Sequence, residues 1–256
     1  MAHSPMDHVL DHAWVGPITK YQVLLVVAAV AVAIPFILLG RKVQDGTPPR
    51  GPFWNFLESL LLYIRDEVVR PNVGEHDADK YVPFLWTLFL FILTCNLLGM
   101  IPFLGSPTAD ISVTLVLAAI VFLVIHIQAI RANGFGGYVK SFIPHLEADN
   151  LPMKIFLTVL IVPLITVIEV MGAVIRGAVL AVRLFANIFA GHVALAVILS
   201  FALAEAAGGM SAGGTVAAVL MGTALSVLEL FVAFLQAFVF VLLTSIFLGM
   251  QLHPEH

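Results

Sequence analysis

The composition of the chain predicts a lipid environment. It has 256 residues, of which 61% are hydrophobic and only 11% are charged, whereas a soluble domain carries about 25% charged residues. A net charge of −4 gives no basic footprint for nucleic acid, and the single cysteine, Cys95, excludes an intrachain disulfide. Uncharged apolar runs longer than about 18 residues recur along the chain, so we predict an all-α polytopic membrane protein.

The N-terminal part predicts one membrane helix preceded by an external tail. Residues 1–20 are polar, and residues 21–40 form an apolar run that is too long for the core of a signal peptide. Arg41 and Lys42 follow this run directly. Because positively charged loops stay in the cytoplasm, we expect the tail outside and the following loop inside.

Residues 51–70 predict an amphipathic helix. Apolar side chains recur in it at helical spacing: Phe53, Phe56, Leu57, Leu60, Leu61, Ile64 and Val68. Polar and acidic residues occupy the other faces, which is typical of a helix lying on a membrane surface or against a partner. We expect Pro71 to end this helix and residues 72–80 to form a polar linker.

Residues 82–130 predict a membrane hairpin. A second span covers 82–105, with Trp86 near one interface, and a short turn leads to a third span over 111–130. We expect Arg131 to end the third span, because the glycines and Lys140 that follow it are typical of a cytoplasmic loop.

Residues 153–252 predict a second, longer hairpin. Its two apolar segments, 155–204 and 215–252, each exceed the roughly 20 residues that cross a bilayer upright. They are therefore either strongly tilted helices or helices with a break, for which Gly177 and the pair Ala190–Gly191 are candidate bends. With this hairpin, the chain is expected to have about five to six membrane helices.

Polar residues are spaced regularly in the first of these two segments. Glu169, Arg176 and Arg183 recur every seven residues, and Asn187 follows four residues later. At about 100° per residue these four positions share one face of a helix, whereas His192 lies about 180° from Arg183.

The last segment has a shorter polar series. Glu229 and Gln236 are also seven residues apart, so they share a face of the last helix. A charge at the bilayer centre costs about 2.5–3.5 kcal/mol on insertion scales, so these groups need partners or water. Together with the polar face of the preceding helix, they indicate a polar path through lipid.

Most of these residues also have a structural explanation. Glu169 and Arg176 fit an ion pair between helices, Asn187 fits a hydrogen bond across a helix interface, and His192 fits a neutral packed side chain. Arg183 is harder to explain in this way. Its guanidinium stays charged up to a pH of about 12, and the long apolar run that follows leaves it no interface to reach.

Three other classes of protein remain as alternatives. A secondary transporter could use Glu169, Arg176 and Arg183 as a substrate or ion site, although such proteins usually show internal repeats. A voltage sensor would carry basic residues at every third position, and here they are seven apart. An assembly subunit would tolerate a neutral residue in place of Arg183.

Three motifs resemble subunit a of F-type ATP synthases. The stretch 182-VRLFANIFAGH-192 is similar to the Arg-Leu-x-x-Asn-x-x-x-Gly helix of that family. The stretch 235-LQAFVFVLLTSIFL-248 is similar to its C-terminal Leu-Gln-Ala helix, and 96-NLLGMIPF-103 is similar to the end of an earlier span. The resemblance covers roughly residues 50–252, with the motifs in the same order.

The resemblance implies a role for each polar residue. Arg183 would be the stator arginine that faces a rotating ring of c subunits, and Asn187 and Gln236 would flank it. His192 and Glu229 would form a polar pair lining a half-channel open to the outside.

The resemblance further matches Glu169 and Arg176 to an acid and a base upstream of the stator arginine. The last two helices would form a long, tilted hairpin against the ring. Peripheral-stalk b-type subunits and the remaining ATP synthase subunits would be the other partners. The chain itself would be non-catalytic and would hold no cofactor or metal. Because no transit peptide is evident, a bacterial inner membrane is the expected location and an organelle inner membrane the alternative.

Overall fold

Helices form almost all of the chain that the structure describes. The computed structural model describes residues 13–15, 18–44, 51–101, 106–141, 161–207 and 212–252. Two short antiparallel strands, β1 (Ala13–Val15) and β2 (Ile18–Thr19), precede the first helix. The helices that follow are α1 (Lys20–Gln44), α2 (Pro52–Tyr63), η2 (Ile64–Val69), α3 (Arg70–Val73), α4 (Glu75–Gly99), η3 (Pro107–Ala109), α5 (Ile111–Ser141), α7 (Val162–Ala207) and α8 (Ala212–Leu252).

Several of these helices are long enough to cross a membrane. Four helical segments of the described part are sufficiently long and apolar: Lys20–Arg41, Glu75–Gly99, Ile111–Tyr138 and Val219–Leu252. In addition, α7 has 46 residues, which at about 1.5 Å per residue is more than twice the roughly 30 Å of a hydrocarbon core. The predicted all-α polytopic membrane fold is confirmed.

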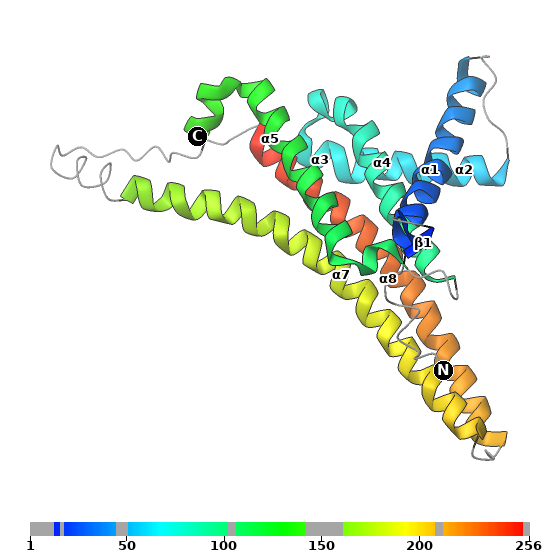
Figure 1. Cartoon of the computed structure of the whole chain (residues 1–256). Helices are drawn as coiled ribbons and strands as arrows, with labels where there is room; N and C mark the ends of the chain where they lie inside the picture. The colour runs from blue at the N-terminus through cyan, green and yellow to red at the C-terminus, as the bar shows by residue number, and fades with distance from the viewer. Residues whose placement is uncertain are drawn as a thin grey trace.

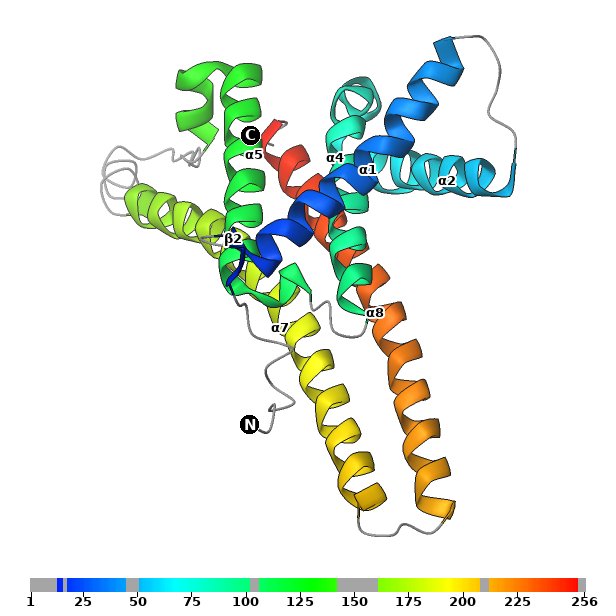
Figure 2. The same ribbon diagram turned by 45° about the vertical axis from the view of Figure 1, so that its right-hand side comes forward.

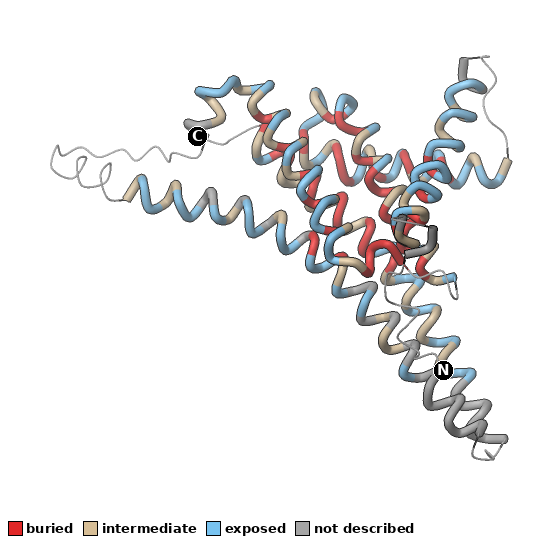
Figure 3. The backbone as a smooth tube through the Cα atoms, in the orientation of Figure 1, coloured by how far each residue is buried: buried red, intermediate tan, exposed pale blue. Residues whose placement is uncertain are grey.

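The helices form a bundle from which a long hairpin projects. Figures 1 and 2 show the C-terminal part of α8 between α4 and α5, while α7 runs past α5 and pairs with α8 along the projecting hairpin. The buried residues are concentrated in the bundle. In Figure 3, most hairpin residues that are coloured by burial are exposed or half-buried. The core includes Leu85, Phe89, Ile92, Leu184, Phe240 and Leu248.

The first membrane helix starts at a capping box. The Gln22 backbone N–H donates to Thr19 Oγ1 (3.4 Å), and the Thr19 N–H donates to Gln22 Oε1 (3.2 Å). This reciprocal pair gives hydrogen-bond partners to two backbone N–H groups that have none within the helix. Further along, Ala28 and Val32 are buried, and α1 contacts α4.

The predicted amphipathic segment is helical and does bury one face. Gly51, with φ of 134°, leads into Pro52 at the first helical turn. Leu57 and Leu61 are buried, whereas Phe56 on another face is exposed. The predicted segment corresponds to α2, η2 and the start of α3.

The prediction that Pro71 ends this segment is wrong. Helical backbone continues through α3, and Gly74, with φ of 94°, ends it. In a regular α-helix the proline ring would meet the carbonyl four residues earlier. Here the preceding turn is π-helical, with the Arg70 N–H bonded to Arg65 O, and this wider turn displaces the carbonyls that the ring would otherwise meet. The predicted linker is accordingly shorter, because α4 begins at Glu75.

The helix of the predicted third span continues past Arg131. α5 begins at an N-cap, where Asp110 Oδ1 accepts from the Ser112 N–H (2.8 Å), and continues to Ser141. Arg131 is a good helix former and does not stop it. The break comes at Gly134, where φ of 70° and ψ of 161° turn the chain back into the hook at the end of α5 in Figure 1.

The long hairpin consists of helices without a break, and Figures 1 and 2 show α7 curving along its length. α7 is one continuous α-helix through Gly177 and through Ala190–Gly191. A glycine inside a helix costs only about 1 kcal/mol relative to alanine, so it need not break the helix when packing supports it. At Gly177 the side chain of Phe122 on α5 would lie 3.6 Å from an added Cβ, an ordinary packing contact.

Candidate functional site

Arg183 lies on a face of α7 that its own chain leaves uncovered. Leu184, the next residue, is completely buried and belongs to the core with Ala237 and Phe240 of α8. One residue along a helix is a rotation of about 100°, so Arg183 turns away from this core. Arg183 is exposed, and Val182 beside it is 49% exposed. The permanent cation therefore stands on an apolar outer surface.

The other predicted site residues on α7 are described by their backbone only. Glu169, Arg176, Asn187 and His192 all lie on the continuous helix, and their side chains lie outside the described residues. Because α7 is unbroken, the rotation of about 100° per residue applies along its whole length. The first three positions therefore follow the same stripe as Arg183, and His192 lies on the opposite side.

Glu229 packs directly against α7. Its side chain is half-buried, and a Cβ added at Gly191 would lie 2.6 Å from Glu229 Oε1 and 3.3 Å from Cδ. Glycine at this position is what allows the carboxyl group to approach the α7 backbone so closely. Gly191 immediately precedes His192, so the structure places Glu229 beside the part of α7 that carries this predicted partner.

Gln236 is buried in the bundle. Only 3% of it is exposed, and the flanking small residues Ala233 and Ala237 are also buried. Because it follows Glu229 by seven residues on a continuous helix, the two share a face of α8. Among the predicted site residues whose side chains are described, Arg183 on α7 is exposed, Glu229 on α8 is half-buried and Gln236 on α8 is buried.

The structure adds a buried polar group that the sequence analysis did not assign to the site. Asn96 on α4 donates from Nδ2 to Ala233 O of α8 (3.1 Å), and its Oδ1 accepts from Thr108 Oγ1 (2.8 Å). A polar amide inside an apolar run requires a partner, because an unbonded amide is costly to bury. This requirement was the only sign in the sequence that Asn96 has a hydrogen-bond partner, and the sequence does not identify that partner.

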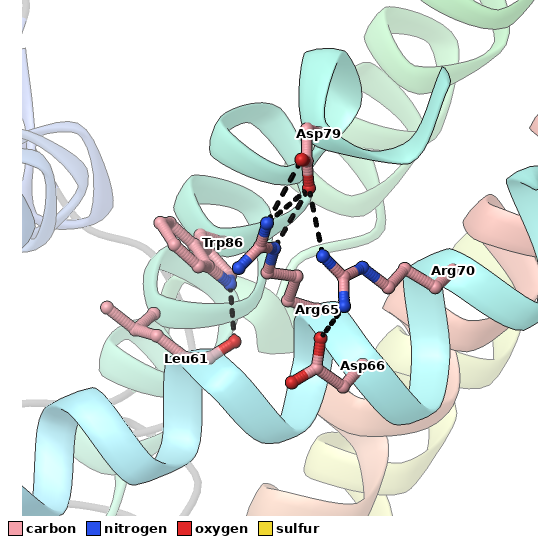
Figure 4. A network of polar contacts seen from close by, with 6 residues as sticks. All are labelled: Leu61, Arg65, Asp66, Arg70, Asp79 and Trp86. Carbon is pink, nitrogen blue, oxygen red and sulfur yellow. Dashed lines mark hydrogen bonds and ion pairs between the residues drawn. The ribbon is translucent and has the colours of Figure 1, made fainter. Parts of the chain in front are cut away.

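A second polar network fixes the amphipathic segment to α4, as Figure 4 shows. Arg65 donates to Asp79 from Nε (2.9 Å) and from a terminal nitrogen (3.0 Å), and Arg70 pairs with Asp66 (2.9 Å). The Trp86 indole N–H donates to Leu61 O (2.8 Å). The Arg65–Asp79 contacts join the π-helical turn to the start of α4, and the Trp86 bond joins α2 to the middle of α4. The two arginines of the network are balanced by two aspartates.

The fold and the site together define a class of protein. It is a multi-pass helical membrane protein whose last two long helices carry charged and amide side chains within apolar surroundings. The family described as ATP synthase A chain matches residues 22–249. The chain belongs to this family.

Similar proteins from three bacteria carry the name ATP synthase subunit a. The Myxococcus xanthus protein is 37% identical over 98% of this chain and 77% of its own length. The Chlorobium phaeobacteroides protein is 36% identical over 93% of this chain and 66% of its own length. An Anaeromyxobacter dehalogenans protein is 40% identical over 78% of this chain. The matches therefore span from 49% to 77% of these relatives.

Proposed function

We propose that this chain is the non-catalytic, proton-conducting stator subunit of an F-type ATP synthase. Membership of the family supports this role, and the exposed position of Arg183 on α7 is the observation that carries it. A guanidinium cannot lose its charge at accessible pH and would cost about 2.5–3.5 kcal/mol in lipid. The surface around Arg183 therefore suits a partner that presents a carboxylate within the membrane.

A rotating ring of c subunits, each with one membrane-embedded carboxyl group, would be that partner. A carboxylate that faces lipid must be protonated, because an isolated charge is too costly there. Opposite Arg183, the same group can remain ionised, since the guanidinium compensates its charge. The ring would then lose a proton before Arg183 and gain one after it.

Two half-channels, one on each side of Arg183, would deliver and remove these protons. Glu229 against Gly191, with His192 next in sequence, would line the half-channel open to the outside. Histidine suits this task because its unperturbed pKa is close to neutral. Each proton that crosses gains about 2.3 kcal/mol per 100 mV, and partner subunits would use the summed energy to form ATP.

The remaining polar positions would extend this path. Asn187 and Gln236 would flank the arginine, and Glu169 with Arg176 would continue its stripe along α7. The surrounding assembly would include b-type peripheral-stalk subunits. A bacterial inner membrane is the proposed location, with the N-terminus outside and the C-terminus in the cytoplasm, as the distribution of Arg41 and other basic residues favours.

Substitution of Arg183 tests the proposal. In inverted membrane vesicles that contain the whole complex, Arg183→Ala is expected to abolish ATP synthesis driven by a proton gradient. Arg183→Lys should be severely impaired, because an ammonium lacks the planar fork of the guanidinium. Arg131→Ala, which removes an exposed arginine near the end of the α5 span, is the matched control and should support synthesis. Normal synthesis by Arg183→Ala would refute the proposal.

A further inference from the structure

We propose that Asn96 is a positioning residue that holds α8 in place at the turn between Glu229 and Gln236. This inference rests on the proposed function, because it concerns the alignment of the proton path. Asn96 itself is 1% exposed and lies on α4, so it acts on the path through α8 and not by contact with the ring.

The network around Asn96 is buried and connected. Asn96, Ser106 and Thr108 are each at most 1% exposed. Thr108 Oγ1 donates to Asn96 Oδ1 (2.8 Å) and lies 2.7 Å from Ser106 Oγ. Since the Thr108 proton is used on Asn96, Ser106 is the donor in the second bond or donates instead to Cys95 O (3.3 Å). Asn96 therefore has a fixed orientation, with its NH₂ group directed at α8.

The acceptor on α8 lies between the two predicted path residues. Ala233 follows Glu229 by four residues and precedes Gln236 by three, so all three positions fall within about 60° of one another around the helix. Ala233 and Ala237 are 1% and 0% exposed, and their small side chains allow α4 to approach the α8 backbone. One amide–carbonyl bond (3.1 Å) thus constrains both the height and the rotation of α8 at this turn.

The same network also reaches α7. Thr108 lies in η3, a buried turn that contacts α4, α5 and α7. Ser106, two residues earlier, packs so closely on α4 that a Cβ at Gly99 would collide with its side chain. Asn96 and Thr108 therefore connect the helix that carries Glu229 and Gln236 with a segment packed on the helix that carries Arg183.

This connection matters because proton transfer depends on fixed distances between groups on the two helices. A misplacement of about 1 Å caused by a distant residue can cost a factor of 100 in rate. Without the Asn96 bond, the turn between Glu229 and Gln236 would be held by apolar packing, since the bonds of Ser245 and Asn133 lie nearer the end of α8. Apolar surfaces slide past one another at little cost compared with directional hydrogen bonds.

The variant that tests the proposal is Asn96→Leu, which keeps the approximate size and removes both hydrogen bonds. Its matched control is Asn133→Leu. Asn133 also donates an interhelical bond to a carbonyl of α8, Gln251 O (3.1 Å), but at the far end of that helix. Both are measured as ATP synthesis per assembled complex in vesicles, so that a loss of assembly is counted separately. We expect a fall of at least about tenfold for Asn96→Leu and less than about twofold for Asn133→Leu.

A structural measurement accompanies the activity. Cys95 is replaced by serine, and spin labels are attached to cysteines at Leu97 on α4 and Leu235 on α8, both of which are 38% exposed. Asn96→Leu should shift or broaden the distance distribution between these labels in the assembled complex, and Asn133→Leu should not.

An isosteric variant provides a rescue that a merely structural role would not show. Asn96→Asp can donate to Ala233 O only as the neutral acid, and its carboxylate has no donor. Activity relative to the parent at the same pH should therefore be partly recovered at low pH and lost as the pH rises. The titratable and charged groups of α7 and α8, among them Arg183, His192 and Glu229, are the same in both proteins. The ratio of the two activities therefore reports the effect of residue 96 alone.

Several outcomes would overturn the inference. One is parental synthesis together with parental label distances in Asn96→Leu, and another is an equal loss in Asn133→Leu. If Asn96→Leu does not assemble, Thr108→Val carries the test, and parental activity and distances in that variant would overturn the inference. The proposed function fails separately, through normal synthesis by Arg183→Ala.

Discussion

The two halves of α8 have similar apolar sequences and different surroundings. In the first half, Val219, Leu220 and Met221 are 63–65% exposed, whereas Ala237, Phe240 and Leu248 in the second half are at most 1% exposed. Figure 3 shows the same change along the helix, from the projecting hairpin to the bundle. One apolar helix therefore serves both as part of a core and as a surface for lipid or for a partner protein.

Hydroxyl groups satisfy their hydrogen bonds differently in the two halves. Thr223 and Ser226 in the first half donate to carbonyls of their own helix, Val219 O (2.8 Å) and Gly222 O (2.9 Å). In the second half, Thr244 also donates within its helix, to Phe240 O (2.8 Å), but Ser245 donates across to Val68 O of the π-helical turn (3.1 Å). The two described hydroxyl groups of the first half thus bond within their own helix, whereas Ser245 in the second half joins α8 to the bundle. Two comparisons test this difference directly, and two more test the packing of α7 and α4, in order from the largest expected effect to the smallest.

The same glycine substitution should have opposite outcomes in the two halves. A Cβ at Gly249 would collide with the backbone carbonyl oxygen of Asn72, whereas a Cβ at Gly222 meets nothing within 4 Å. Gly249→Ala should lower the free energy of unfolding by about 2–3 kcal/mol, since backbone cannot move aside easily. Gly222→Ala should be neutral or stabilising by up to about 1 kcal/mol. Denaturant unfolding of the purified chain in detergent measures both, and equal stability would contradict the comparison.

On α7, substitutions of Gly191 and Gly177 distinguish an effect on ATP synthesis from an effect on stability. Gly191→Ala would push the Glu229 carboxyl group away, because the added Cβ would lie 2.6 Å from Oε1. The end of a flexible side chain can move, so stability should change little while ATP synthesis falls by about tenfold. Gly177→Ala, whose Cβ would make an ordinary 3.6 Å contact, should retain both. Unchanged synthesis in Gly191→Ala would show that the close approach of Glu229 to α7 is not required.

A pair of serines compares the hydroxyl groups directly. Ser245→Ala removes a buried bond between α8 and the π-helical turn, and should cost about 1 kcal/mol. The loss is moderate because Asn72 Nδ2 also donates to Val68 O, at 2.6 Å. Ser226→Ala removes a bond within one helix and should change the unfolding free energy by less than about 0.5 kcal/mol. A larger loss for Ser226→Ala than for Ser245→Ala would contradict the assignment of the interhelical role.

The smallest effect is expected at the ion network of Figure 4. Asp79→Asn removes the partner of Arg65 and should cost about 0.5–1 kcal/mol at low salt, because the aspartate side chain is 58% exposed and the pair is screened. The difference should shrink as salt is added. Glu75→Gln controls for the loss of an acidic charge in the first turn of the same helix. A salt-independent loss would show that packing, and not charge, fixes the amphipathic segment.

The main helices could be predicted from the sequence, but the residues at which they end could not. The apolar run at 21–40 predicted α1 (Lys20–Gln44), and the spacing of apolar residues predicted the amphipathic segment. Pro71 was wrongly expected to end a helix, and the helix of the third span continues past Arg131 to a break at Gly134. A helix end depends on whether the freed backbone groups find partners, and a π-helical turn supplied an alternative at Pro71.

The candidate site was predictable in its residue types and spacing. Seven-residue intervals place Arg183 in one stripe of α7, and the same interval relates Glu229 to Gln236, as soon as both segments are helical. The sequence could not indicate that Gln236 is buried while Arg183 is exposed, because lipid and protein interior select the same apolar neighbours.

By itself, the sequence determined that the chain crosses a membrane several times and carries a permanent cation in an apolar helix. Both follow from local chemistry: the length of apolar runs and the pKa of a guanidinium. Only the tertiary structure decided that Glu229 lies against Gly191 and that Asn96 bonds to Ala233, 137 residues away. Such pairings depend on how helices pack, and helical periodicity describes the face of one helix without identifying the helix that covers it.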